Sequence, residues 1–156
     1  HPKDKQTVGK RLALAARKVA YHEKNCFTSP HYKRMKVEGD KIRVFFDDIG
    51  NGLIAKGGGG LKRFAIAGAN KQFVWANAEI QDNTVLVWSP QIKSPCSVRY
   101  SFENNPEGCN LFGKNGMPVS PFRTDAWIVV SQPRKKIGNK YGSLQEKKHS
   151  CQIIQT

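Results

Sequence analysis

Apolar side chains recur at helical spacing in the first part of the chain. Between residues 4 and 21 they fall three or four positions apart, largely separated from the lysines and arginines, at Val8, Leu12, Ala15 or Ala16, and Val19. Pro2 before this segment and Asp4 in its first turn are typical of a helix start. The pattern predicts an amphipathic helix with one apolar stripe, which must lie against another element. The sequence contains no second helical pattern of similar strength.

From Met35 onward the period changes to two. A hairpin is predicted by apolar residues that alternate on either side of a Gly39-Asp40 turn: Met35, Val37, Ile42, Val44 and Phe46. Further strands are predicted at Phe64–Ala67, Phe73–Ala76, Glu79–Ile80, Val85–Trp88 and Ser97–Phe102. Trp127–Val130 offers one more. Short strands separated by turn residues predict an antiparallel β-sandwich or a small barrel.

These patterns predict an α+β chain, with one N-terminal amphipathic helix followed by an antiparallel β-sandwich-like domain. We expect the helix in residues 1–23, a linker containing Ser29-Pro30 in 24–34, and the β domain in 35–127. Residues 128–156 form a basic tail, for which an ordered and a disordered state both stay open.

Length and charge narrow the classes of function. With 156 residues, of which 38% are apolar, the chain can bury one core. The net charge of +14 divides into +7 for residues 1–34, +2 for 35–125 and +5 for 126–156. Because the middle segment is nearly neutral, we expect no nucleic-acid partner for the β domain. No apolar run approaches the ~18 residues of a membrane span, and Lys3, Asp4 and Lys5 interrupt any signal-peptide pattern.

Glycine, histidine and cysteine groups offer little specific chemistry. The Gly57–Gly60 run has no Lys-Ser/Thr after it and opens no helix, so a flexible turn is favoured over a phosphate-binding loop. Two groups of potential metal ligands lie close in sequence: His22, Cys26 and His31, and His149 with Cys151. Neither supplies four ligands at zinc-site spacing, so we expect no metal and no cofactor. For the four cysteines, Cys26, Cys96, Cys109 and Cys151, disulfides and free thiols both stay open.

Two tryptophans and two arginines carry competing interpretations. Trp75 and Trp88 could form an aromatic platform for a sugar ring, but tryptophans within a two-residue period are more often core. Arg99 and Arg123 could bind a carboxylate through two hydrogen bonds each, although solvent-facing strand arginines are commoner.

The histidine at the start of the chain has a distinctive context. His1 precedes a proline and a helix start, which holds it on an ordered loop where one ring nitrogen can face a nucleophile and the other a carboxylate. The stretch His1–Ala13 resembles the last catalytic block of the sialate O-acetylesterase family, which are SGNH-type serine esterases. Further blocks similar to the family follow in the same order: Leu61–Gly68, Pro95–Tyr100, Asn104–Pro106, Asn110–Phe112 and Gly116–Asp125.

This resemblance implies that His1 is the histidine of a Ser-His-Asp triad. In the family the orienting aspartate lies three residues before that histidine, and the serine and oxyanion blocks lie further upstream. The 156 residues contain no Gly-Asp-Ser or Gly-Glu-Ser sequence. The resemblance therefore implies a C-terminal fragment: the closing helix of an α/β hydrolase domain, followed by an appended β domain. Residues 128–156 and the Gly57–Gly60 run depart from the family pattern.

The function that the resemblance implies is hydrolysis of O-acetyl esters of sialic acids or related sugars. Its partners would be an acetylated sugar substrate and the missing N-terminal hydrolase domain, without nucleic acid or membrane. We expect a periplasmic or secreted protein, and an isolated chain that is inactive without its nucleophile. The alternative is a noncatalytic carbohydrate-binding β module that uses Trp75, Trp88 and Arg99.

Overall fold

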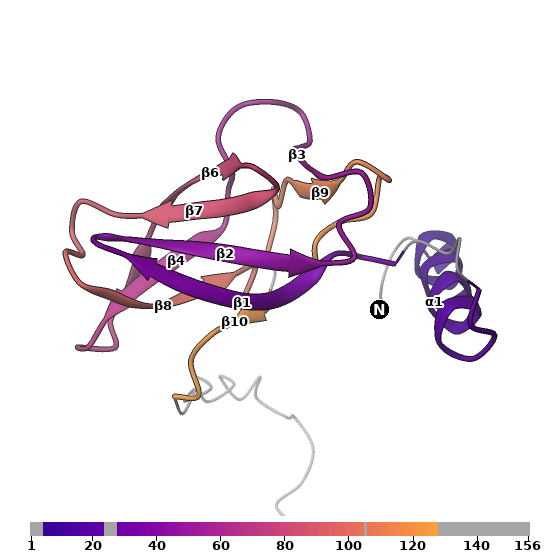
Figure 1. Cartoon of the computed structure of the whole chain (residues 1–156), viewed down its shortest axis with the longest axis horizontal. Coiled ribbons are helices and arrows are strands. Elements are labelled where there is room, and N and C mark those ends of the chain that lie inside the picture. The colour runs from indigo at the N-terminus through magenta and orange to yellow at the C-terminus, as the bar shows by residue number, and fades with distance from the viewer. Residues whose placement is uncertain (1–4, 24–27, 105, 128–156) are drawn as a thin grey trace, which may run out of the picture.

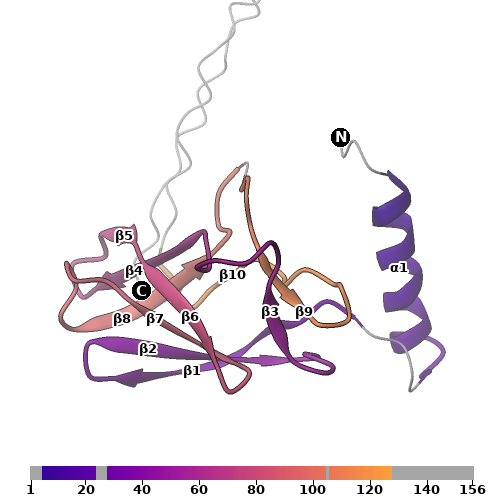
Figure 2. The same cartoon turned by 90° about the horizontal axis from the view of Figure 1, so that it is seen from above.

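The N-terminal segment forms the predicted helix, α1, over Lys5–Val19. The computed structural model describes residues 5–23, 28–104 and 106–127. None of the helix residues is buried, and its apolar stripe is open to solvent, with Leu12 67% and Val19 72% exposed. Figures 1 and 2 show α1 standing beside the strands rather than covering either sheet.

A polar contact joins the helix to the β domain. Lys18 in the last turn of α1 donates to a carboxylate oxygen of Asp48 and, over 3.3 Å, to the hydroxyl of Thr28. The Thr28 hydroxyl in turn donates to the second carboxylate oxygen of Asp48 at 2.6 Å. Burial favours a raised pKa for Asp48, but the hydrogen bonds from Lys18 and Thr28 outweigh it and lower the pKa of that carboxyl.

The first sheet contains the predicted hairpin and runs in the order β1-β2-β7-β6, with every pair antiparallel. Its strands are β1 His31–Glu38, β2 Lys41–Asp47, β6 Asn77–Gln81 and β7 Thr84–Trp88. The β6–β7 turn places Asp82 and Asn83 at positive φ, which is typical of tight hairpin turns. One boundary differs from the prediction, because β1 begins at His31 and so takes in residues 31–34 of the expected linker. Those residues are mostly polar and exposed on an edge strand, which hides the strand pattern.

The second sheet has the order β10-β8-β4-β5 and is also antiparallel. Its strands are β4 Phe64–Gly68, β5 Phe73–Trp75, β8 Pro95–Tyr100 and β10 Phe122–Arg123. A two-stranded sheet pairs β3 Leu53–Ala55 with β9 Leu111–Gly113. The sequence pattern does not indicate β3, β9 or β10, which span only two or three residues each. Trp127 lies outside any strand, and the rest of the segment Trp127–Val130 lies beyond the described residues.

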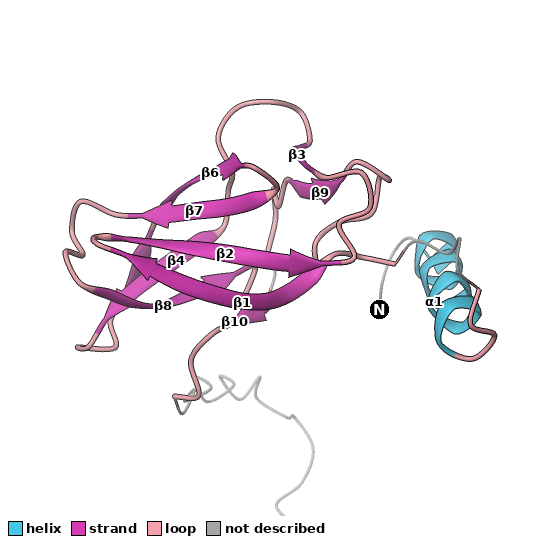
Figure 3. Cartoon of the chain, viewed as in Figure 1, coloured by secondary structure: helices cyan, strands magenta, loops and turns pink. Residues whose placement is uncertain are grey.

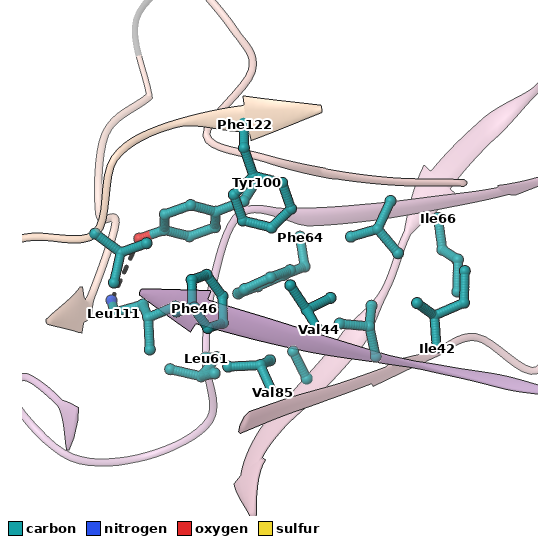
Figure 4. Packing of buried hydrophobic residues seen from close by; sticks show 14 of the residues in the cluster. Ile42, Val44, Phe46, Leu61, Phe64, Ile66, Val85, Tyr100, Leu111 and Phe122 are labelled. Carbon is teal, nitrogen blue, oxygen red and sulfur yellow. Dashed lines mark hydrogen bonds between the residues drawn. The ribbon is translucent and has the colours of Figure 1, made fainter. Parts of the chain in front are cut away.

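One cluster of buried hydrophobic residues draws on both larger sheets and forms the core. Figure 2 shows the strands of these sheets from above, and Figure 3 shows them by element type. The alternating residues Ile42, Val44 and Phe46 of β2 belong to one cluster with Phe64 and Ile66 of β4 and with residues of β7, β8 and β10 (Figure 4). The predicted helix followed by an antiparallel sandwich is therefore confirmed. The division into a hydrolase helix, a linker, a β domain and a tail stays a prediction, and residues 128–156 lie outside the described part of the chain.

An aromatic group fills one end of this core. The Tyr100 ring packs against Phe64 at 4.6 Å and Phe122 at 5.9 Å between ring centroids. Its hydroxyl oxygen accepts a hydrogen bond from the backbone N–H of Leu111 at 3.3 Å, drawn as the dashed line in Figure 4. Burial raises the pKa of Tyr100 far above its usual range, so the hydroxyl stays neutral.

Candidate functional site

The outer face of the second sheet carries a groove built on a cross-strand row. Ala65 of β4 pairs with Trp75 of β5 on one side and with Arg99 of β8 on the other. Because Phe64 and Ile66 are core residues and side chains alternate along a strand, this row faces away from the core. The small Ala65 between two large side chains leaves a hollow of about 520 Å³. The hollow is lined by Arg63, Ala65, Phe73, Val74, Trp75, Gln91, Arg99, Phe102 and Glu103.

Arg99 forms one wall of the groove and is held firmly in place. Its Nε and Nη2 atoms donate to the two carboxylate oxygens of Asp125, at 2.8 and 2.7 Å. The guanidinium also lies over the Phe73 ring at 4.0 Å and the Phe102 ring at 5.1 Å from the centroids. The hydrogen bonds from Arg99 lower the pKa of Asp125, and the same bonds raise the pKa of Arg99. Both groups therefore stay charged at neutral pH.

Arg99 thus makes the two-point carboxylate contact that was considered beside the commoner, solvent-facing interpretation, but the carboxylate belongs to the chain itself. The Asp125 side chain is fully covered, so no external ligand reaches it. Arg123 does not share this role. It is exposed, lies over the Phe102 ring at 5.5 Å and donates to the backbone carbonyl of Trp127 at 3.2 Å. Arg123 therefore matches the commoner interpretation of a solvent-facing strand arginine.

Trp75 and Trp88 have different environments. Trp75 is 62% exposed and lines the groove, so the prediction that it belongs to the core is wrong. Trp75 is the last residue of the short strand β5, and its side chain lies on the outer face of the sheet. Trp88 lies in the first sheet, half-buried, with the Lys41 ammonium 4.9 Å from its ring centroid. The two tryptophans therefore do not form the joint platform considered from the sequence.

A second hollow shares two of its lining residues, Arg63 and Trp75, with the first. It measures about 570 Å³ and is lined by Leu61, Lys62, Arg63, Phe64, Trp75, Ala76, Glu107 and Gly108. Arg63 and Trp75 border both hollows, and the Arg63 guanidinium lies 5.8 Å from the centroid of the Trp75 ring. Arg63 also donates through Nε to the carbonyl of Glu107 at 2.5 Å and forms a 3.4 Å ion pair with Glu103. The indole of Trp75 is thus the shared border of one continuous, hollowed surface.

Trp75 and Arg99 were candidate residues from the sequence, but most of the residues that line the groove were not. Arg63, Gln91, Phe102 and Glu103 come from turns and loops that the folded sheet brings together. Arg63 adopts a left-handed backbone conformation with a φ of 66°. No local pattern in the sequence marks such a residue.

The Gly57–Gly60 run forms a turn between β3 and β4, as predicted. Gly57, Gly58 and Gly59 have φ values of 83°, 73° and 73°, and the Gly58 N–H donates to the Ala55 carbonyl at 3.1 Å. A side chain at any of these positions would meet open space, so their backbone conformation, rather than crowding, favours glycine.

The remaining sequence candidates lie apart or outside the described residues. His1, Cys26, His149 and Cys151 fall on segments that are not described. Within residues 5–23, 28–104 and 106–127, no group of three or more histidine, cysteine or acidic side chains could hold a metal ion. Cys96 is an exposed free thiol and Cys109 a half-buried one. No described helix has the length and hydropathy needed to cross a membrane.

The match that bears on function is with a solved structure. No protein-family model matches the chain, and a search of curated proteins gives no match either. The chain is similar to the crystal structure of a carbohydrate acetylesterase from Xanthomonas citri, with a TM-score of 0.76 and 45% sequence identity. This chain resembles part of a carbohydrate acetylesterase. The similarity covers 81% of this chain but only 29% of the Xanthomonas enzyme, so this chain spans less than a third of that enzyme.

The acetylesterase likeness supports the general part of the sequence-based expectation, a carbohydrate esterase. At 45% identity and a TM-score of 0.76, it also shows that the matched part of this chain shares its fold with that enzyme. The preference for sialic acids, the SGNH type of hydrolase domain and the role of His1 are finer statements that this likeness does not test.

Proposed function

We propose that this chain is part of a carbohydrate esterase that hydrolyses O-acetyl esters of sialic acids or related sugars. The observation that carries the proposal is its 45% identity with part of a carbohydrate acetylesterase. The family blocks from His1–Ala13 to Gly116–Asp125 support the more specific sialate O-acetylesterase type. The same proposal places the protein in the periplasm or outside the cell.

In this proposal His1 is the general base and acid of a Ser-His-Asp triad. Its imidazole takes the proton of a serine hydroxyl as the serine oxygen attacks the acetyl carbonyl carbon. When the tetrahedral intermediate collapses, the ester C–O bond breaks and the imidazolium gives its proton to the departing sugar oxygen. Water then hydrolyses the acetyl-serine by the same proton transfers and releases acetate. The serine, the aspartate and the oxyanion donors would come from residues outside this chain.

The exposed stripe of α1 supports a covering partner for this helix. Val8, Leu12 and Val19 are 36%, 67% and 72% exposed, which leaves an apolar surface on a helix that is amphipathic by sequence. A helix of this kind is normally stabilised by packing its apolar face against other elements. We propose that the partner is the hydrolase domain that the family resemblance implies, attached next to His1.

Hydrolysis of p-nitrophenyl acetate tests the proposal. The isolated chain should give no turnover above that of free imidazole, because a triad histidine without its nucleophile gains little. The longer protein that contains this chain should hydrolyse the ester, be blocked by a serine-directed inhibitor and lose at least about 10³-fold in kcat on His1→Asn. Full activity of the His1→Asn protein would overturn the assignment of His1. Comparing 9-O-acetylated sialic acid with acetylated neutral sugars then tests the preferred sugar.

A further inference from the structure

We propose that the groove around Trp75 binds an uncharged stretch of a glycan chain, with a sugar ring stacked on the indole. The inference rests on the proposed function in one respect, since the carbohydrate class of the ligand follows from the esterase assignment. It goes beyond that function by giving the β domain a binding site of its own. The site would hold a polysaccharide while its acetyl groups are removed elsewhere.

The shape of the surface fits a chain longer than one sugar. Two hollows of about 520 and 570 Å³ meet at Trp75 and Arg63, and each has the size of a typical small-ligand site. Ala65 forms the floor of the first hollow because it is the smallest side chain in the row Trp75–Ala65–Arg99. A chain passing over Trp75 would place one sugar on the indole and its neighbours in the two hollows.

The walls of the first hollow are aromatic. Trp75, Phe73 and Phe102 line it, and the 62% exposure of Trp75 leaves a large apolar ring open to solvent. Such rings bind the flat C–H faces of sugars in which the hydroxyl groups are equatorial, because those faces are themselves apolar. Polar groups surround the aromatic surface. The Gln91 amide can donate to or accept from the hydroxyl groups of a sugar, and the Glu103 carboxylate can accept from them.

The charged residues that line the first hollow determine whether a neutral or an acidic sugar fits there. The guanidinium of Arg99 is already neutralised by Asp125, and that of Arg63 is paired with Glu103. A ligand carboxylate would therefore meet no unpaired cation among the residues lining the first hollow, and at Arg63 it would face the like charge of Glu103. Sugar hydroxyl groups require no such exchange. The first hollow consequently favours a neutral glycan over a free sialic acid.

Calorimetric titration of the 156-residue chain tests this inference without any ester hydrolysis. The neutral probes are cellotetraose and xylotetraose, whose β-1,4-linked sugars have flat C–H faces, and the acidic probe is N-acetylneuraminic acid. We expect at least one neutral tetrasaccharide to bind and the acidic sugar to bind at least about tenfold more weakly. Absence of binding by both tetrasaccharides, or preferred binding of the acidic sugar, would overturn the proposal.

Two variants test the groove by different changes. Trp75→Ala removes the stacking surface, and Ala65→Phe keeps the indole but fills the hollow. Each should weaken tetrasaccharide binding about tenfold or more, the loss expected for one aromatic stacking contact. Trp88→Phe, on the other sheet, is the matched control and should bind as the natural chain does. Equal binding by all three variants would place the ligand elsewhere.

A third variant tests the role of charge. Glu103→Gln leaves the shape of the groove but removes the carboxylate that neutralises Arg63. We expect it to strengthen N-acetylneuraminic acid binding several-fold relative to tetrasaccharide binding. Circular dichroism of each variant confirms that the sandwich is folded. These binding measurements need no ester hydrolysis, whereas the esterase assignment is tested by the activity of the longer protein and its His1 variant. A negative result for the groove can therefore be told apart from a negative result for the esterase assignment.

Discussion

Arg99 and Asp125, 26 residues apart in the sequence, form a two-point ion pair at the edge of the second sheet, with N–O distances of 2.8 and 2.7 Å. The Asp125 side chain is fully covered and the Arg99 side chain is 19% exposed. The pair ties the segment after β10 to β8, where the Thr124 N–H also donates to the Val98 carbonyl at 3.0 Å. It thereby fixes both the wall of the groove and the end of the described sandwich.

Removing the arginine of this pair should destabilise the β domain. Arg99→Ala leaves the covered Asp125 carboxylate without its cation, and we expect a loss of about 3 kcal/mol in the free energy of unfolding. Urea denaturation followed by circular dichroism measures it. Arg123→Ala is the control, because this arginine is exposed and its removal should cost no more than about 0.5 kcal/mol. Equal effects of the two substitutions would contradict the structural role of the pair.

The same pair should make stability depend on pH in the acidic range. Hydrogen bonds from Arg99 lower the pKa of Asp125 in the folded state below its unfolded value near 4. The ionised carboxylate therefore contributes stability above about pH 4, and this contribution is lost as the pH falls through the lower folded pKa. Asp125→Asn lacks it. The difference in unfolding free energy between the natural chain and Asp125→Asn should be constant from pH 7 to pH 5 and shrink below about pH 4.

The hydroxyl of Tyr100 provides a test of the core. Tyr100→Phe keeps the ring against Phe64 and Phe122 but leaves the Leu111 N–H without its acceptor. We expect a loss of about 1 kcal/mol in unfolding free energy. Tyr100→Ala, which also removes the buried ring, should cost about 3–5 kcal/mol. Thermal or urea unfolding of both variants measures the comparison, and equal losses would show that the hydroxyl rather than the ring is decisive.

Weakening the contact between α1 and the sandwich should loosen the helix without unfolding the sandwich. Asp48→Asn removes the charge that Lys18 contacts, and asparagine suits the left-handed backbone at this position, where φ is 58°. We expect trypsin to cleave within α1 several-fold faster, while the unfolding free energy of the β domain falls by no more than about 1 kcal/mol.

Asp47→Asn is the matched control for this change. Asp47 pairs with Lys33 at 2.8 Å on the neighbouring strand rather than with the helix. Its substitution should leave cleavage in α1 at the natural rate. If both variants were cleaved equally fast, the Lys18–Asp48 contact would not hold the helix.

The strand β2 could be predicted because buried and less buried residues alternate strictly along it. Ile42, Val44 and Phe46 alternate with less buried residues throughout β2, so both the strand and its buried face follow from the sequence. The strands β3, β9 and β10 are too short to show a period. β3 and β9 pair with each other and β10 pairs with the end of β8, so each depends on a partner that is distant in the sequence. The start of β1 was missed because its polar residues reflect an exposed edge rather than a loop.

The groove was predictable only in part, because it depends on register between strands. Trp75 and Arg99 attract notice as single residues, but their common neighbour Ala65 becomes visible only once β4, β5 and β8 are aligned. The same holds for the Arg99 partner, since no local signal selects Asp125 among the chain's twelve acidic residues. The predicted catalytic residue, His1, rests on family resemblance and lies outside the described residues.

The side chain at position 65 can change without altering the core of this domain. Its two chain neighbours, Phe64 and Ile66, belong to the core, while its own side chain forms the floor of the groove. A mutation of this one codon can deepen, narrow or close the hollow while the sandwich around it keeps its packing. Related domains could thus diverge in what they hold on this face without first acquiring compensating changes in the core.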